Sequence, residues 1–351
     1  MVGVRVEPEP EGDALRIGIV GAGWAAAEHC KTLARLEGIT IAAVADPDAR
    51  RSLDLARPHQ AGAYPTATEM IADETLDAVV VATPPGAHRE ASIEAIEAGL
   101  SVFLEKPISR SVDDAWAIVA AATRANAVCA VGYQWRAIPA LEPLSEALRS
   151  EGLRHLVSEG IGVTQARSWF LDDAMSGRLI AERGSHHLDL QRRVGGEIIA
   201  VQAAGSDLRA RELDRILNGA SSTETSVLLT LQFASGALGA VHVIWVPEGY
   251  PSRQRLTAFG TVSTYELELD PTFSLRRNSG EPLLPDPTAE HPFAAGLVRF
   301  IDAARRKDPE GVVCTPLEAA KTLEVVVACE HALVTGETVH VGQMPRSGVA
   351  P

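Results

Sequence analysis

The sequence has little cysteine, and it has fewer basic than acidic residues. Cysteine occupies four of 351 positions, with no CxxC pair and no Cys/His cluster at zinc-ligand spacing. We therefore expect buried, reduced thiols in a cytoplasmic protein and no metal centre. Lysine and arginine total 32 against 46 aspartates and glutamates, and the net charge of −14 argues against nucleic acid as a partner.

Long hydrophobic runs are also missing. Runs such as Ala78–Thr83 are far shorter than the roughly 18 residues that span a bilayer, so we expect no membrane segment. Residues 1–13 are acidic and proline-containing without an apolar stretch, and we expect a flexible lead-in that is not a signal peptide. The remaining length suits about two domains of roughly 150 residues each.

Residues 14–138 alternate short apolar runs with helical patterns, which predicts an α/β domain built on a doubly wound parallel sheet. We expect strands at Leu15–Val20, Ile39–Ala45, Ala78–Ala82, Ser101–Leu104 and Ala127–Gly132. We expect helices at Ala25–Leu36, Glu69–Ala72, Ala87–Ala98 and Val112–Ala125.

Residues 139–345 predict a second α/β domain with a large, open and mostly antiparallel sheet. The expected strands are Leu156–Thr164, Ile198–Ala204, Thr225–Phe233, Leu238–Trp245, Arg255–Phe259 and Tyr265–Leu269. Other expected features are a hairpin turn at Ser235 and Gly236, a loop at Asn278–Glu290, and helices at Pro292–Arg306 and Pro316–Thr335. Two such domains favour an enzyme with its cleft between them.

The first strand leads into a glycine loop in which Gly21, Gly23 and Ala26 fit the GxGxx[G/A] pattern of dinucleotide-binding domains. Gly21 permits a tight turn, and Gly23 lets the backbone approach a pyrophosphate. Trp24 and Ala25 then open a helix whose N-terminus favours negative charge. The alternative is a glycine-rich turn that binds no ligand.

Asp46 ends the second expected strand, 23 residues after Gly23, close to the spacing of a carboxylate that binds the ribose hydroxyls. Such a carboxylate repels a 2′-phosphate, so we expect NAD. NADP is the alternative, because Arg50 and Arg51 follow on the next turn and are able to attract that phosphate.

A Glu105-Lys106-Pro107 turn ends the fifth expected strand. Since ligands bind outside the carboxyl ends of parallel strands, this turn is expected to face the cofactor cleft. A lysine there can stabilise alkoxide character on a substrate oxygen. The alternative is an ordinary surface lysine.

The segment Glu182–Asp189 carries the second candidate group. If it is helical, Glu182, His186 and Asp189 share one face, and the two carboxylates orient the imidazole and hold its pKa near neutral. His187 points away, into packing or the surface. The alternatives are a metal site built from these three residues and a buried histidine without a chemical role.

Taken together, the chain resembles the Gfo/Idh/MocA oxidoreductase family from about Arg16 to Val341. The resemblance rests on "GIVGAGWAAAEH", "VADPDARR", "VVVATPPGAHRE", "FLEKPIS", "AVGYQWRAIPAL", "ERGSHHLDL", "LQFASGALGAV" and "EAAKTLEVVVACEHALVTGETVHV". It implies a Rossmann domain followed by an α/β domain whose open sheet mediates a homodimer or homotetramer. It also implies NAD(P)-dependent oxidation or reduction of a secondary alcohol of a sugar, inositol or related polyol.

The resemblance places the catalytic lysine at Lys106, followed by a cis bond to Pro107, and the acid/base histidine at His186. Glu182 stands where the family commonly has aspartate. The implied cofactor contacts include Thr83, Pro84, His88, Glu105 and Gln134, and the implied substrate contacts include Trp135 and Trp169 beside Lys106 and His186. Inositol dehydrogenases often carry arginine where Trp135 stands, and an indole is better suited to stacking on a sugar ring.

In the expected mechanism, His186 accepts the hydroxyl proton, Lys106 polarises the oxygen, and hydride passes to the nicotinamide. Two other readings of the scaffold stay open. One is a non-catalytic regulator that senses sugar or NAD, and the other is an enzyme that uses tightly bound NAD for transient oxidation.

Overall fold

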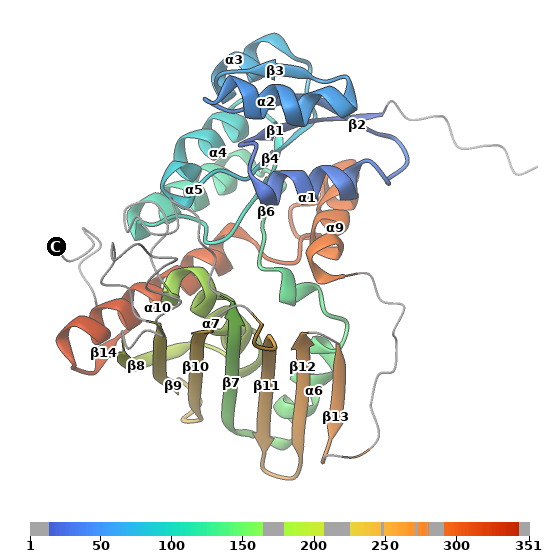
Figure 1. The fold of residues 1–351 in the computed structure, drawn as a ribbon. Coiled ribbons are helices and arrows are strands. Elements are labelled where there is room, and N and C mark those ends of the chain that lie inside the picture. Colours follow the sequence, from blue (N-terminus) through green and yellow to red (C-terminus); the bar gives the residue numbers. More distant parts are fainter. Residues whose placement is uncertain are drawn as a thin grey trace, which may run out of the picture.

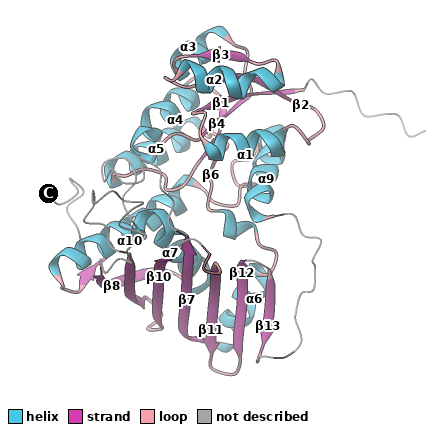
Figure 2. Ribbon diagram, in the orientation of Figure 1, coloured by secondary structure: helices cyan, strands magenta, loops and turns pink. Residues whose placement is uncertain are grey.

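The computed structural model describes residues 14–163, 179–206, 225–246, 249–270, 273–278, 280 and 291–343. It contains two sheets, one in each half of the molecule, with helices between them (Figures 1 and 2). The expected lead-in at residues 1–13 lies outside the described part, as does the loop expected at Asn278–Glu290 apart from positions 278 and 280.

The first sheet is parallel throughout and has the strand order β3-β2-β1-β4-β5-β6. This is the order of a Rossmann fold, so the predicted doubly wound sheet is confirmed. The central strands are largely apolar because helices cover both faces. The strands are β1 (Leu15–Val20), β2 (Ile39–Ala45), β3 (Gly62–Tyr64), β4 (Ala78–Val81), β5 (Ser101–Leu104) and β6 (Cys129–Val131).

The connections of this sheet are helical. They are α1 (Trp24–Leu33), α2 (Ala49–Ala56), α3 (Ala67–Asp73), α4 (His88–Glu97) and α5 (Val112–Ala125), with 3₁₀ turns η1 (Arg57–His59) and η2 (Pro85–Ala87). Side chains cap several of them: Asp48 caps α2, Thr66 caps α3 and Ser111 caps α5. Neither α2 nor the short β3 was predicted.

The second sheet has the order β13-β12-β11-β7-β10-β9-β8-β14, and of its pairings only β7 with β10 is parallel. The predicted open, mostly antiparallel sheet is confirmed. Its strands are β7 (Leu153–Val163), β8 (Ile198–Ser206), β9 (Ser226–Phe233), β10 (Leu238–Val246), β11 (Arg253–Gly260), β12 (Thr264–Asp270), β13 (Ser274–Arg277) and β14 (Val339–His340).

The expected hairpin joins β9 to β10. Gly236 adopts a φ of +86°, and its N–H donates to the Phe233 carbonyl. Along β9, buried and exposed residues alternate, so one face of the sheet is packed and the other is open.

Helices cover the packed face of the second sheet. They include α6 (Leu141–Glu151), the π-helical turn η5 (Ile180–Gly184), α7 (Ser185–Gly195) and α10 (Pro316–Thr335). The 3₁₀ turn η3 (Gln134–Ala137) follows β6 of the first sheet and lies against α7. The unpredicted elements here are α6, β13 and β14. Among the described residues, no helix is long and apolar enough to cross a bilayer.

The helix α9 (Pro292–Arg306) packs against the first sheet although it follows strands β7–β13 of the second sheet in the chain. Its Leu297, Phe300 and Ile301 lie in one buried cluster with Ile19 of β1 and Phe103 of β5. A segment between β13 and β14 of the second sheet therefore completes the packing of the first. The boundary predicted at residues 138/139 stays a prediction.

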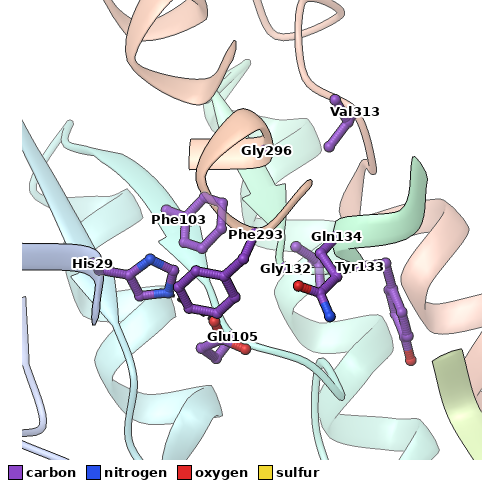
Figure 3. Close-up of a pocket in the computed structure, with 10 residues that line it drawn as sticks. His29, Phe103, Glu105, Gly132, Tyr133, Gln134, Phe293, Gly296 and Val313 are labelled. Atoms are coloured by element: carbon purple, nitrogen blue, oxygen red, sulfur yellow. Dashed lines mark hydrogen bonds and ion pairs between the residues drawn. The ribbon is translucent and has the colours of Figure 1, made fainter. Parts of the chain in front are cut away.

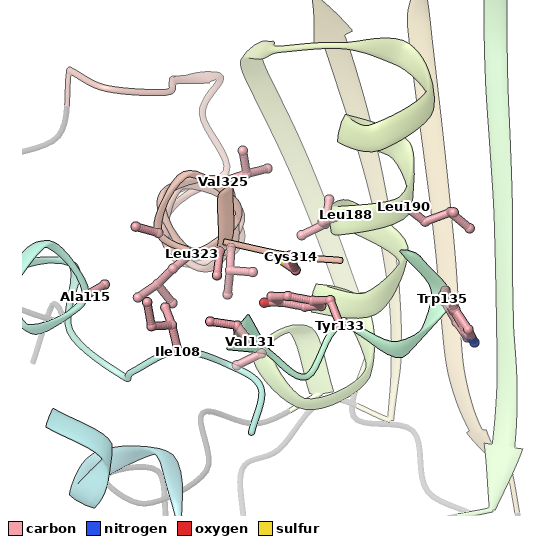
Figure 4. Packing of buried hydrophobic residues seen from close by; sticks show 14 of the residues in the cluster. Ile108, Ala115, Val131, Tyr133, Trp135, Leu188, Leu190, Cys314, Leu323 and Val325 are labelled. Carbon is pink, nitrogen blue, oxygen red and sulfur yellow. The ribbon is translucent and has the colours of Figure 1, made fainter. Parts of the chain in front are cut away.

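A larger buried cluster spans both halves of the molecule (Figure 4). It joins Val131 of β6 and the following Tyr133 to Leu188 of α7 and to Leu323 and Val325 of α10. Because both sheets contribute to one continuous core, the carboxyl ends of β4–β6 are held against η5 and α7.

Candidate active site

The glycine loop connects β1 to α1. Gly21 has a φ of +90°, and a Cβ there would lie 2.8 Å from the Ala82 carbonyl oxygen, so no other residue fits. A Cβ at Gly23 would meet nothing within 4 Å, and no described side chain caps α1. Trp24 and Ala25 provide the first backbone N–H groups of this uncapped helix. The loop thus leaves open space before a helix N-terminus, which suits a pyrophosphate.

Asp46 directly follows β2 beside this loop and is largely buried. Its Oδ2 accepts the Ala22 N–H at 2.7 Å, and its Oδ1 accepts the Asp48 N–H at 2.9 Å. Each oxygen therefore keeps a further lone pair, and the carboxylate is fixed where the ribose of a dinucleotide is expected.

The loop after β4 carries Thr83 and Pro84. The Thr83 hydroxyl is buried without a hydrogen-bond partner, as expected for a group that meets a ligand. His88 is fully buried beneath the loop, with Nε2 lying 2.8 Å from the Thr83 carbonyl oxygen and Nδ1 lying 3.0 Å from that of Pro107. Both ring nitrogens thus face backbone carbonyls, and His88 supports the loop; its predicted cofactor contact stays a prediction.

Lys106 follows β5, and the Lys106–Pro107 bond is cis, as the resemblance implied. Its Nζ donates to Oε2 of Glu182 at 3.2 Å and to the Glu182 carbonyl at 3.1 Å. The Lys106 side chain is 16% exposed. One ammonium group therefore spans from the first sheet to η5, and Oε1 of Glu182 stays buried without a partner.

The predicted arrangement of carboxylates on either side of His186 is wrong. Residues 180–184 form a π-helical turn, which holds an extra residue and rotates Glu182 relative to α7. Glu182 binds Lys106, and Asp189 binds Arg136 through two hydrogen bonds of 2.8 Å and one of 3.1 Å. The three side chains predicted as an alternative metal site do not converge, and the described residues hold no metal-ligating cluster.

The prediction of a near-neutral pKa for His186 is also wrong. Burial holds the pKa of His186 well below its usual value of 6.5, and the positive charges of Lys106 and Arg183 lower it further. Its Nδ1 has no hydrogen-bond partner. A neutral imidazole with an unpaired nitrogen is able to accept a proton.

His187 is fully buried, as its predicted packing role requires. Its Nε2 lies 3.0 Å from Oε1 of Gln254 on β11, and burial lowers its pKa to about 3. Gly160 of β7 makes room for this ring, because a Cβ there would overlap His187 Nε2.

Trp135 lies beneath the two histidines. Its ring centroid is 5.1 Å from that of His186 and 4.8 Å from that of His187, and the residue is 8% exposed. The indole is thus mainly a packing surface that orients His186. Trp169, predicted as a second substrate wall, lies outside the described residues.

A small pocket opens beside Glu105 (Figure 3). Gln134 lines it, and its Oε1 is buried without a partner, consistent with the predicted cofactor contact. Among the lining residues that sequence reasoning missed are His29 of α1 and Phe293 of α9. His29 had a usable signal, because it shares the buried face of α1 with Ala26, Cys30 and Leu33, where a polar side chain requires a partner.

Comparison with known proteins matches both halves of the chain. Residues 15–133 match the oxidoreductase family with an NAD-binding Rossmann fold, and residues 152–266 match the GFO/IDH/MocA C-terminal domain. Inositol 2-dehydrogenase 2 of Saccharopolyspora erythraea is 26% identical over 344 residues, or 95% of this chain and 97% of that protein. UDP-N-acetylglucosamine 3-dehydrogenase of Acidithiobacillus ferrooxidans is 28% identical over 192 residues, or 54% of this chain and 58% of that protein.

Among solved structures, GenD2 from gentamicin A biosynthesis, in complex with NAD, has a TM-score of 0.79 at 24% identity. The match covers 96% of this chain and 99% of that one, and at this identity it shows the shared fold. The resemblance inferred from the motifs is confirmed by the two domain models in their proper order. The chain belongs to the Gfo/Idh/MocA family of NAD-binding oxidoreductases.

Proposed function

We propose that the protein is an NAD-dependent dehydrogenase of a secondary alcohol on a sugar, inositol or related polyol. One observation carries most weight: Lys106 reaches across from the first sheet to Glu182 of η5, and its charge acts on the neighbouring His186. A cation and a neutral imidazole thus meet at the carboxyl ends of the parallel strands, where a cofactor of this family binds.

In the oxidative direction, the Lys106 ammonium donates a hydrogen bond to the substrate oxygen and stabilises its developing negative charge. His186 accepts the hydroxyl proton, because its imidazole is neutral at physiological pH. Glu182 holds Lys106 in position. When bound, the nicotinamide supplies the hydride acceptor. In the reverse direction, protonated His186 returns the proton to the carbonyl oxygen.

A polyhydroxylated substrate is supported by two observations. The names of the relatives place inositol and a nucleotide sugar among the substrates of similar proteins. In this chain, the buried Oε1 of Glu182 and Nδ1 of His186 are unpartnered polar atoms, which suit substrate hydroxyl groups.

We propose NAD in preference to NADP. The Asp46 carboxylate is fixed beside the glycine loop and disfavours a 2′-phosphate. Both basic residues that follow have an acidic neighbour, either on α2 or at its N-cap. Arg50 lies 3.7 Å from Asp54, and Arg51 lies 3.4 Å from Asp48.

We also propose a homo-oligomer assembled through the open face of the second sheet. Leu228 of β9 and Leu238 of β10 are about half exposed there, and Ile199 of β8 and Phe259 of β11 are also exposed. Exposed large apolar side chains on a sheet face are typical of an interface. Light scattering of the purified protein tests the oligomer.

All four cysteines are free thiols, which suits the reducing cytoplasm.

The experiment that tests the function follows absorbance at the reduced-nicotinamide band with NAD or NADP and a panel of inositols, aldoses and glycosides. We expect cofactor reduction with one substrate group, faster with NAD, and its loss in Lys106→Ala. Binding of NAD without net reduction by any substrate would contradict this proposal and favour transient oxidation or a regulator. Faster turnover with NADP would overturn the cofactor assignment.

A further inference from the structure

His29 is a buried, titratable side chain that the proposed mechanism leaves unused. It lies on α1, the helix that begins at the cofactor loop, and its side chain is 1% exposed. Its Nε2 lies 2.7 Å from Oε1 of Glu105, whose side chain is 12% exposed. This hydrogen bond joins the helix that follows Gly23 to the turn that carries Lys106.

Aromatic rings hold the imidazole in one orientation. Phe293 of α9 stacks on it with centroids 4.5 Å apart and an interplanar angle of 10°. Phe103 of β5 meets it edge-on at 5.1 Å. Figure 3 shows the Phe293 and His29 rings side by side above Glu105. Because these rings come from different elements, His29 is fixed toward the carboxylate.

The second oxygen of the Glu105 carboxylate contacts a backbone N–H and lies against a glycine. This oxygen, Oε2, accepts the Lys106 N–H at 3.1 Å, and a Cβ at Gly132 would come within 3.2 Å of the same oxygen. Burial raises the pKa of Glu105, but the hydrogen bond to His29, with the charges of His29 and Lys106, outweighs burial and leaves the pKa below its usual value. The chain thus keeps a negative charge inside the protein.

That charge lies where the cofactor is expected. Glu105 and Gln134 line the same pocket at the carboxyl ends of β5 and β6, and Oε1 of Gln134 is a buried acceptor without a partner. In an open parallel sheet, the reactive ring of a dinucleotide lies outside these strand ends. An oxidised nicotinamide ring carries a positive charge and a reduced ring carries none, so a nearby carboxylate favours the oxidised form.

We propose that His29 is a positioning residue that holds Glu105 as an ionised carboxylate beside the nicotinamide site, and thereby raises the affinity for NAD⁺ relative to NADH. This inference rests on the dehydrogenase function proposed above and concerns the cofactor side of the same site. His29 acts through Glu105 and touches neither the substrate nor the reacting atoms.

The test measures the dissociation constants of NAD⁺ by calorimetry and of NADH by its fluorescence, using the full chain near neutral pH. His29→Phe keeps a ring for Phe293 to stack on but has no hydrogen-bond donor. We expect His29→Phe and Glu105→Gln each to lower the preference for NAD⁺ over NADH about tenfold, equivalent to roughly 1.4 kcal/mol. His29→Gln keeps an N–H donor and is expected to restore most of the preference.

Leu33→Val is the matched control, because Leu33 lies buried on the same helix and has no polar group. It is expected to leave the NAD⁺ preference unchanged. An unchanged preference in Glu105→Gln, or in a folded His29→Phe, would overturn the inference, and Glu105→Gln alone decides if His29→Phe does not fold. A wild-type chain that binds neither form would overturn the dehydrogenase proposal, and this inference with it.

Discussion

His186 combines an unpartnered ring nitrogen with a position among positive charges. Burial and the positive charges of Lys106 and Arg183 all disfavour its protonated form. These influences make it a base that is already neutral at physiological pH. They also make its protonated form a stronger acid, which assists the reverse reaction.

The pH dependence of oxidation follows from this low pKa. His186 accepts a proton only when neutral, so kcat/KM is expected to stay level as pH falls to 6.5 and to decrease only below it. His186→Asn is expected to lower kcat about 10²- to 10⁴-fold and to remove the acidic decrease. The measurement is a pH–rate profile of both proteins with saturating cofactor. A decrease centred at or above pH 6.5 would contradict this assignment.

Glu182 is expected to position Lys106 without carrying the transferred proton, because its carboxylate contacts the ammonium group. Glu182→Gln keeps a hydrogen-bond acceptor for Nζ but removes the charge. We expect kcat/KM to fall about tenfold, or roughly 1.4 kcal/mol. Steady-state kinetics beside His186→Asn distinguish the roles: a loss in Glu182→Gln as large as that in His186→Asn would indicate that the carboxylate relays the proton.

At the scale of elements, glycines on the second sheet allow η5 and α7 to pack close to its strands. A Cβ at Gly160 would overlap His187, one at Gly162 would overlap Arg183, and one at Gly239 would overlap Gln191. The helical segment that carries His186 therefore lies directly on β7 and β10. Its distance from the sheet is short because these glycines have no side chain.

Gly160→Ala is expected to destabilise the protein by about 1–3 kcal/mol, because the added methyl group displaces the buried His187 ring. The loss is measured by urea unfolding. Gly296→Ala is the matched control: its Cβ would lie 3.9 Å from Val313, within ordinary contact, in the helix α9. We expect it to be neutral or stabilising. Equal stability of Gly160→Ala and wild type would show that the ring moves freely.

At the scale of the whole molecule, a buried ion cluster fastens the first sheet to the helices of the second. Arg136 of η3 binds Asp189 of α7, and Asp189 also accepts a hydrogen bond from Thr322 of α10. Glu318 of α10 lies 3.4 Å from Arg136 and from Arg192. These contacts hold α7, and therefore His186, in place against the Rossmann half.

Asp189→Asn is expected to cost about 3–5 kcal/mol of unfolding free energy, because Arg136 then loses its main counter-charge inside the core. Glu142→Gln serves as the control, since Glu142 pairs with Arg149 and Arg193 at the surface, and we expect no measurable change. Both are compared by urea unfolding. A small loss in Asp189→Asn would show that Glu318 alone compensates Arg136.

Much of the fold could be predicted from local pattern. The bounds of β1, β2, β5, α5, α9 and α10 agree with those expected. These elements are strongly apolar or amphipathic, and several begin at a capping side chain or a proline. The short β3 and β14 have little hydrophobic periodicity of their own. They form because their backbones pair with the edge strands β2 and β8.

The sequence by itself determined the family, and it predicted the glycine loop as the cofactor site and Lys106 and His186 as the catalytic pair, because each depends on residue types at short spacing. Only the tertiary structure decided how their charges pair. A π-helical turn rotates Glu182 away from the helical face on which it was expected beside His186. Asp189 forms its ion pair with Arg136, which comes from a distant segment of the chain. Likewise, the contact between His29 and Glu105 links residues 76 positions apart. Such pairings depend on packing between distant segments, which local periodicity does not encode.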